Sequence, residues 1–99
     1  MLLETKQLFT NRSRMAIIAN LLACSIGGSR KTKLIYKCNL NVAQFNKYAD
    51  RLIEGGLLEK KIQVVQGRKA FEVYHTSKKG IQFLRDYHRL DETINEIIA

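Results

Sequence analysis

The first clear pattern of apolar positions runs from Met15 to Cys24. Apolar side chains recur there at the spacing of one helical face, at Met15, Ile18, Leu21, Leu22 and Cys24. Asn11 or Ser13 can cap the start of this segment, and the Gly27-Gly28 pair can end it, because glycine adopts the left-handed conformation easily. The pattern predicts a first helix between these limits.

Two more helical patterns lie on either side of a short turn at residues 38–40. The first can begin around Thr32, whose hydroxyl can accept a bond from a backbone N–H. The second runs from Asn41 to Glu54, with Asn41 as its cap. Tyr36 in the shorter helix and Tyr48 in the longer one are expected in the core, with their hydroxyl groups at its rim. A tight turn between two helices would hold the second at a fixed angle to the first.

The longer of these helices has two different faces. The face expected against the core carries Val42, Phe45, Tyr48, Ala49, Leu52 and Ile53. The opposite face carries Ala43, Gln44, Lys47, Arg51 and Glu54. An outer face with an amide and two cations is suited to contact another molecule, so a binding function is expected on this helix.

A β-hairpin is predicted after the Gly55-Gly56 pair, which should stop the helix. Residues 57–65 and 70–76 are rich in β-branched and aromatic side chains, and they flank a short segment with Gly67 at its bend. The tip of this hairpin is basic. The side chains expected to project from it are Gln66, Arg68 and Lys69.

A last helix is predicted over residues 77–99, with Ser77 as its cap. Apolar side chains recur along it in alternating steps of four and three, as in the seam of a coiled coil, at Phe83, Tyr87, Leu90, Ile94 and Ile97. In one interpretation a second copy of the chain covers this seam. In the other, the seam folds back within a monomer on Leu2, Leu3, Leu8 and Phe9. We favour the homodimer, because so regular a seam has few partners left within the chain.

The order of predicted elements indicates the fold. Three helices followed by a two-stranded hairpin, with the second and third helices joined by a tight turn, form the layout of a winged helix-turn-helix domain, an α+β fold. A chain of 99 residues supports a single core of this kind. We therefore expect an N-terminal arm over residues 1–10, a winged helix-turn-helix domain over residues 11–76, and a C-terminal dimerisation helix over residues 77–99.

Charge narrows the class of partner. The chain has 17 Lys and Arg against 9 Asp and Glu, a formal net charge of +8, which favours an anionic partner such as nucleic acid or an acidic membrane surface. No apolar run approaches the roughly 20 residues that a membrane span needs, and acidic and polar residues interrupt the N-terminal segment where a signal peptide needs an apolar core. We expect a cytoplasmic protein that contacts no membrane.

The sequence contains no motif typical of catalysis or of cofactor binding. Cys24 and Cys38 have no second ligand at zinc spacing, and the glycines near Gly28 lack the spacing of a phosphate-binding loop. His75 and His88 have no carboxylate placed to orient them. We therefore expect no enzyme, metal, cofactor or small-molecule ligand.

Candidate DNA contacts follow from the layout, because the third helix of such a domain enters the major groove and its hairpin touches the backbone or the minor groove. They are Asn41, Gln44, Lys47 and Arg51 on the third helix, Arg30, Lys31, Thr32 and Lys33 around the start of the second, and Gln66, Arg68 and Lys69 on the hairpin. Gln44 can pair with adenine, and Lys47 or Arg51 with guanine. The remaining basic side chains would act mainly on phosphates.

Four segments of the chain, spanning about Arg12 to Tyr87, carry a family resemblance: "RSRMAIIANLLAC", "GSRKTKLIYKCNLN", "KYADRLIEGGLL" and "VYHTSKKGIQFL". Together they resemble the archaeal winged helix-turn-helix family of small basic DNA-binding proteins. That family includes transcription regulators and chromatin-associated dimers joined by a C-terminal coiled coil. The chain departs from the chromatin-type members in a shorter last helix and a longer, more basic hairpin.

The resemblance has implications for partners and sites. It implies duplex DNA as partner, no cofactor, and a homodimer built on the last helix. By matching position it would place residues 30–33 near phosphates, Gln44, Lys47 and Arg51 on the recognition face, and Arg68 and Lys69 on the wing.

Two other functions remain open from the residues alone. A winged helix can serve as a protein-interaction module, with its basic charge directed at an acidic protein surface. The hairpin favours phosphate contact over this role, because its basic tip carries no aromatic anchor. RNA binding is the other alternative, although the predicted strands lack the aromatic pair on which RNA bases would stack.

Overall fold

The structure, a computed structural model, describes residues 13–67 and 69–98. Its elements are α2 (Arg14–Cys24), α3 (Lys31–Cys38), α4 (Val42–Glu54), β1 (Leu58–Gln63), β2 (Phe71–Thr76) and α5 (Lys78–Ile98). This order confirms the predicted α+β winged-helix architecture. The predicted N-terminal arm, together with Asn11 and Arg68, lies outside the described residues.

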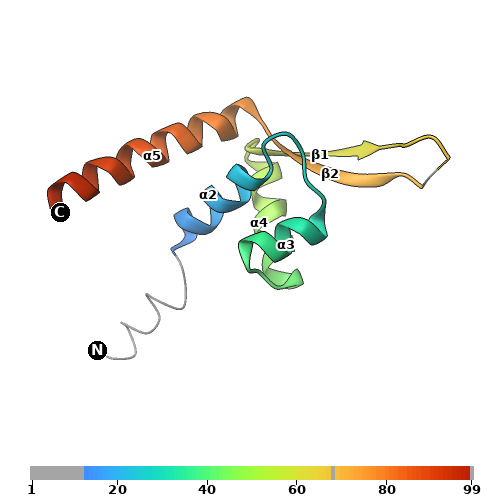
Figure 1. Cartoon of the computed structure of the whole chain (residues 1–99), viewed down its shortest axis with the longest axis horizontal. Helices are drawn as coiled ribbons and strands as arrows, with labels where there is room; N and C mark the ends of the chain where they lie inside the picture. Colours follow the sequence, from blue (N-terminus) through green and yellow to red (C-terminus); the bar gives the residue numbers. More distant parts are fainter. Residues whose placement is uncertain (1–12, 68, 99) are drawn as a thin grey trace.

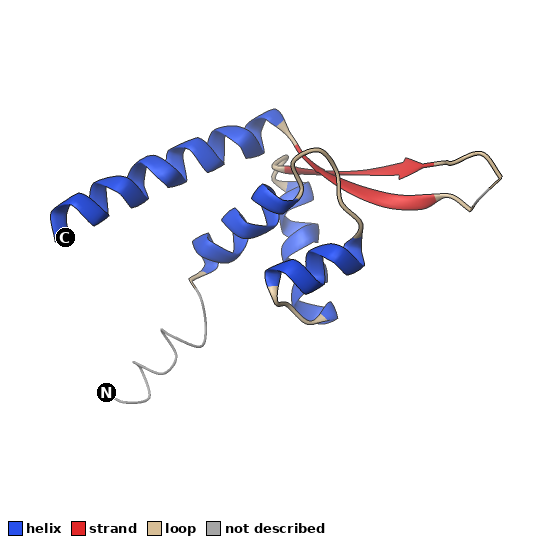
Figure 2. Ribbon diagram, in the orientation of Figure 1, coloured by secondary structure: helices blue, strands red, loops and turns tan. Residues whose placement is uncertain are grey.

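Helices α2, α3 and α4 gather at the centre of the molecule, and two elements project from them (Figure 1). The β-hairpin extends to one side and α5 to the other. Figure 2 shows in the same view that the outer half of the hairpin has no helix beside it. The two projecting elements therefore offer surface that the central helices do not cover.

The ends of α2 and α3 are set by local hydrogen bonds. The Ser13 hydroxyl accepts a bond of 3.1 Å from the Ala16 N–H, which confirms Ser13 as the cap of α2. Asn39 ends α3 in the left-handed conformation, with a φ of 53°, and the Leu40 N–H donates to the Ile35 carbonyl at 3.0 Å. Asparagine tolerates this conformation better than most residues, so the turn forms without glycine.

The predicted cap of α3 is wrong. The residue that precedes the helix is Arg30, in an extended conformation and without a side-chain capping bond, and Thr32 lies inside the first turn. The reason is a contact with a distant part of the chain. Ser29 pairs with Tyr74 of β2 through two backbone bonds of 3.0 and 2.8 Å, which keep the chain extended until Arg30.

Both predicted ends of α4 are confirmed. The Asn41 carboxamide oxygen accepts from the Gln44 N–H at 2.7 Å, and the Asn41 N–H donates to Gln44 Oε1 at 3.0 Å, which forms a capping box. At the other end Gly56 has a φ of 79°, and the Leu57 N–H donates to the Leu52 carbonyl at 2.9 Å. These bonds satisfy groups that a helix end leaves unpaired.

Strands β1 and β2 pair antiparallel, in a register that joins Leu58 to Thr76 and Gln63 to Phe71. The Ser29 bridge adds one further pair at the outer edge of β2. Side chains alternate between the two faces of a strand, and the consecutive residues Val73 and Tyr74 are both buried. Tyr74 meets Phe45 of α4, and Val73 lies against the loop at Gly28. The hairpin is therefore packed on both faces near its base.

The core lies where α2, α3, α4 and the base of the hairpin meet. Its fully buried side chains are Leu21, Leu22, Leu34, Cys38, Phe45 and Leu58. The Phe45 ring meets the Tyr74 ring edge-on, with centroids 5.3 Å apart and planes at 87°. Such contacts add to the stabilisation from apolar burial, so this pair fixes the hairpin on α4.

Helix α5 begins in close contact with the end of α4. The Ser77 hydroxyl accepts from the Gly80 N–H at 3.1 Å, which confirms the predicted cap, and the Lys79 ammonium donates to the Gly55 carbonyl at 2.8 Å. A Cβ on Gly80 would lie only 2.3 Å from the Leu57 carbonyl oxygen. Glycine at this position therefore allows α5 to approach the turn that follows α4.

Three apolar side chains that were expected in the core are exposed. Tyr36 is 86% exposed, Val42 is 56% exposed and Met15 is 46% exposed. Tyr36 lies two residues from both buried side chains of α3, Leu34 and Cys38, and this spacing places it on the opposite side of the helix. Val42 and Met15 occupy first turns, where the helices extend past the core.

Candidate nucleic-acid interface

The outer face of α4 carries two of the predicted contacts, Lys47 and Arg51, both exposed and one turn apart. They border a groove of about 170 Å³ between α2 and α4, which is lined by Arg14, Ile18, Lys47, Tyr48, Arg51 and Leu52. Arg14 joins them from the first turn of α2, a residue that the sequence reasoning did not select. Three cations around one groove repel each other, so an anion between them would be stabilised.

Asn41 and Gln44, at the start of α4, already have partners. In the capping box, Gln44 Oε1 accepts a bond from the backbone of Asn41. Reading adenine through both groups of the amide would require that oxygen to accept from the base instead. The structure thus places Gln44 on the predicted face and gives it a competing structural role.

Acidic side chains limit the part of α4 that can meet phosphates. Asp50 and Glu54 are both exposed, one helical turn apart, and they lie beside the edge that carries Lys47 and Arg51. Asn46, another exposed side chain that the sequence reasoning passed over, lies beside Asp50. The surface suited to an anion is therefore the edge of α4 nearest α2.

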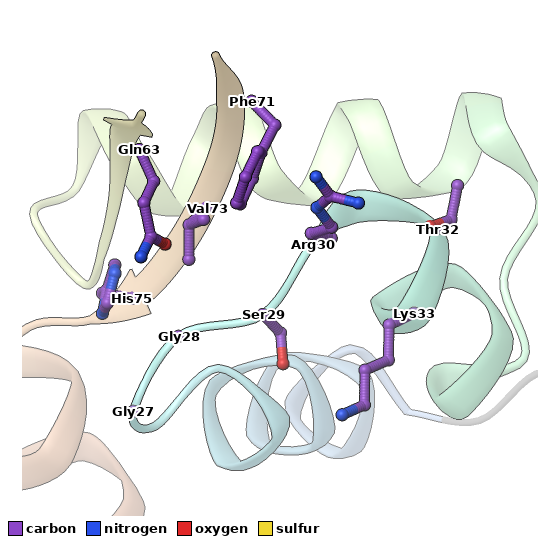
Figure 3. A pocket seen from close by; sticks show the side chains of 10 residues that line it. All are labelled: Gly27, Gly28, Ser29, Arg30, Thr32, Lys33, Gln63, Phe71, Val73 and His75. Atoms are coloured by element: carbon purple, nitrogen blue, oxygen red, sulfur yellow. The ribbon is translucent and has the colours of Figure 1, made fainter. Parts of the chain in front are cut away.

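The predicted contacts around α3 meet at a second groove, of about 430 Å³, between the start of α3 and the hairpin (Figure 3). Its lining consists of Gly27, Gly28, Ser29, Arg30, Thr32, Lys33, Gln63, Phe71, Val73 and His75. The Arg30 guanidinium carbon lies 3.7 Å from the centre of the Phe71 ring. Lys31 faces the core instead, with its Nζ 5.8 Å from the centre of the Phe45 ring.

This second groove can accept an anionic group. Its lining holds the cations Arg30 and Lys33 and the hydroxyl of Thr32, and it includes no carboxylate among the described residues. Gly28 forms part of its floor with a φ of +100°, and a Cβ there would lie 2.7 Å from His75 Cε1. A larger residue at Gly28 would push the loop off β2 and change the shape of the groove.

The hairpin tip carries the third group of predicted contacts. Gln66 and Lys69 are exposed beside Gly67, which turns the chain with a φ of 76°, whereas Arg68 lies outside the described residues. Figure 1 places this tip far from the bundle, so it does not join either groove. Three exposed apolar side chains of the same hairpin lie outside the set of predicted contacts, namely Ile62, Val64 and Val65.

The exposed Tyr36 lies on the outer face of α3 with Lys33 and Lys37, which are exposed as well. A ring that is 86% exposed gains little from packing, yet its hydroxyl can donate to a phosphate. Tyr36 is thus a candidate contact that the sequence reasoning assigned to the core. The two lysines at helical spacing around it were the signal for an outer position.

One tyrosine of strand β2 has a side chain whose pKa is shifted. Burial raises the pKa of the Tyr74 hydroxyl above its ordinary value of 10.0, and the carboxylates of Glu72 and Asp50 add to this shift. Tyr74 also forms the edge contact with Phe45. Its role is therefore structural, at the junction of the hairpin and α4.

The seam of α5 divides into two parts. Phe83 and Tyr87 are stacked with centroids 6.4 Å apart and pack against the core of the same chain. Leu90, Ile94 and Ile97 lie beyond the core and are 54%, 53% and 75% exposed. The predicted dimerisation residues are thus not equivalent, and the last three form what we call the open seam.

Among residues 13–67 and 69–98, no group of three or more His, Cys, Asp or Glu side chains is placed to hold a metal ion. No helix in the same part of the chain has the length and apolar character to cross a membrane.

Known structures share this fold. The crystal structure of smu.1704 from Streptococcus mutans UA159 is 20% identical, with a TM-score of 0.68 over 87% of this chain and 89% of that one. Sso10a-2, a DNA-binding protein from Sulfolobus solfataricus, is 21% identical, with a TM-score of 0.59 over 89% and 98%. A PadR-like transcription factor from Bacteroides fragilis is 21% identical, with a TM-score of 0.58 over 84% and 89%.

A search of curated proteins found no match. The sequence pattern of one family, in contrast, matches residues 11–95, which include all described elements except the last residues of α5. The match covers the helix-turn-helix, the hairpin and the start of the open seam together. The chain belongs to the winged helix-turn-helix family.

Proposed function

We propose that this protein binds double-stranded DNA as a winged-helix transcription regulator, with α4 in the major groove and the hairpin on the backbone or in the minor groove. The observation that carries the proposal is the groove between α2 and α4, where Arg14, Lys47 and Arg51 surround a space without an acid in its described lining. The net charge of +8 and the family support it. The names of two structural neighbours, a DNA-binding protein and a transcription factor, agree with this role.

The test is fluorescence anisotropy of the protein with a random-sequence duplex and with the DNA upstream of its own gene, each across a salt series. Lys47→Gln together with Arg51→Gln should weaken binding to both, and it should reduce the slope of log affinity against log salt by about 2, because roughly one counterion is released per phosphate contact. Arg85→Gln removes an exposed arginine from α5 and serves as the control. Equal binding by the double variant and the control would contradict the proposal.

The same measurement separates two modes of DNA binding. Tighter binding to the upstream duplex that persists at high salt would indicate a sequence-specific regulator. Equal affinities that fall together with salt would indicate a DNA-organising protein that reads phosphates. Absence of binding to either duplex would favour the protein-interaction module.

We infer that the binding unit is a homodimer joined through the open seam of α5. Leu90, Ile94 and Ile97 expose apolar surface beyond the core, and water contact with such a stripe is unfavourable. A two-fold dimer would present two copies of α4 to two half-sites. A palindromic or closely paired operator is then the natural target of a specific regulator.

A further inference from the structure

The part of the hairpin beyond its last strand pair, Gln63 and Phe71, extends past the protein core. On β1 only Leu58, at the base, is buried, and on β2 the buried residues are Val73 and Tyr74. A two-stranded hairpin is marginally stable alone, and at the outermost rung Phe71 still meets the Arg30 guanidinium. Exposed apolar side chains toward the turn are therefore open to contact with another molecule.

The hairpin nevertheless exposes three β-branched apolar side chains. Ile62 is 64% exposed, Val64 is 70% exposed and Val65 is 41% exposed. Side chains branched at Cβ lose little freedom when they are immobilised, because few χ1 rotamers are open to them. We call these three stiff side chains, which precede the turn at Gly67, the apolar tip.

Charge identifies the kind of partner. The two acids of the hairpin each lie near a lysine: Glu59, at the base, is 4.0 Å from Lys61, and Glu72, opposite Ile62 in the strand register, is 3.8 Å from Lys60. In the sequence, residues 64–71 contain Arg68 and Lys69 and no acid. Val64 and Val65, the outer part of the apolar tip, therefore lie in a cationic segment beyond both acids, and such a segment suits a polyanionic partner.

We propose that the apolar tip is a wedge that enters the minor groove of duplex DNA, partly unstacks a base step and bends the duplex. Proteins that kink DNA combine apolar side chains between base steps with amide and cationic side chains along the groove, and Gln66 and Lys69 supply the latter. The tip carries no aromatic anchor of the kind that dominates protein interfaces. This inference rests on the proposed DNA binding and adds an activity to it, namely deformation of the bound duplex.

The experiment measures energy transfer between dyes at the two ends of a short duplex, with and without the full-length protein. Binding of the wild type should bring the ends together. Val64→Ser combined with Val65→Ser should abolish most of this change and weaken binding by about tenfold, because the apolar contact that offsets unstacking is lost. The salt slope of binding should stay the same, since no cation is removed.

Two controls identify the cause of any effect. Ile26→Ser removes an apolar side chain that is 55% exposed in the turn after α2, and it should leave both bend and affinity unchanged. Lys69→Gln should reduce the salt slope by about 1 and leave the bend in place. Thermal unfolding of each variant reports whether it folds, and all these side chains are exposed enough that the midpoints should agree.

The outcomes separate the wedge from the proposed function. Binding of the wild type without a change in end-to-end distance overturns the wedge and leaves DNA binding intact. A bend that survives Val64→Ser and Val65→Ser also overturns the wedge. Failure of the wild type to bind any duplex overturns both, and serine variants that change only the oligomeric state would show that the apolar tip contacts protein.

Discussion

At the scale of single residues, the side chain of Tyr36 is expected to matter for DNA binding and hardly at all for the stability of the fold. It is 86% exposed on α3, between the exposed Lys33 and Lys37. An exposed ring contributes little to the folded state, whereas a hydroxyl among cations can donate to a phosphate that the cations attract.

Tyr36→Ala should change the free energy of unfolding by no more than about 0.5 kcal/mol and should weaken duplex binding several-fold. Chemical denaturation and fluorescence anisotropy measure the two effects. Tyr36→Phe isolates the hydroxyl from the ring. A large loss of stability in the alanine variant would mean that the ring is packed, contrary to its exposure.

Tyr74 makes stability depend on pH. Burial, with the carboxylates of Glu72 and Asp50, raises the pKa of its hydroxyl in the folded protein above 10.0. Above that pH the unfolded chain loses the proton while the folded chain keeps it. Folding then becomes less favourable as pH rises toward the folded pKa, and the contribution is fully present below pH 10.

The free energy of unfolding should therefore fall more steeply above about pH 10 in the wild type than in Tyr74→Phe, which has no proton to lose. Urea denaturation at a series of pH values measures the difference between the two proteins. Identical pH profiles would show that Tyr74 titrates alike in both states. The comparison cancels the lysine titrations that occur in the same range.

At the scale of elements, the junction of α5 with the α4–β1 turn depends on Gly80. A Cβ at this position would lie 2.3 Å from the Leu57 carbonyl oxygen and 2.6 Å from Thr76 Cγ2. Backbone atoms cannot move aside as a flexible side chain does. The gain in helix propensity from alanine is therefore smaller than the cost of displacing α5.

Gly80→Ala should lower the free energy of unfolding by roughly 1–3 kcal/mol, although alanine favours a helix over glycine. Asn95→Ala, at an exposed position of the same helix, should be neutral or slightly stabilising. Urea denaturation of the two variants compares them directly. A stabilised Gly80→Ala variant would mean that α5 does not pack against the turn as closely as described.

At the scale of the whole molecule, the open seam determines the oligomeric state. Leu90, Ile94 and Ile97 lie where α5 has left the core. Ile94→Asp would place a charge in the seam of the proposed dimer, where it would lose its water without gaining a partner.

Ile94→Asp should convert the dimer to a monomer, as measured by sedimentation at micromolar concentration. Asn95→Asp adds the same charge one position away from the seam and should leave the dimer intact. A wild type that sediments as a monomer would overturn the dimer. Because the seam lies beyond the core, the circular dichroism of the monomeric variant should still show the folded bundle.

Most of the fold was predictable because its signals are local. Ser13, Asn41 and Ser77 cap helices by bonding to backbone groups three residues away, and Gly56 ends α4 through its own conformation. Such features depend on neighbours in sequence, which a pattern of residues records directly.

The parts that escaped prediction depend on distant residues or on short elements. Arg14 meets Lys47 only because α2 packs beside α4, and Arg30 stacks on Phe71 through the pairing of Ser29 with β2. Helix α3 has only about two turns, and so few residues do not show from the sequence which side of the helix is buried. The pattern therefore predicts the wrong face of α3 for Tyr36.

The contacts that begin α5 also bear on the geometry of DNA recognition. Lys79 and Ser77 donate to the carbonyls of Gly55 and Gly56, so the start of α5 is bonded to the end of α4. In the proposed dimer, the length of α5 therefore sets the distance between the two α4 helices. Adding one heptad to α5 beyond the core would lengthen this helix by about 10 Å. That length is only a fraction of the roughly 34 Å helical repeat of B-DNA, so the two α4 helices would no longer be in phase with the original half-sites.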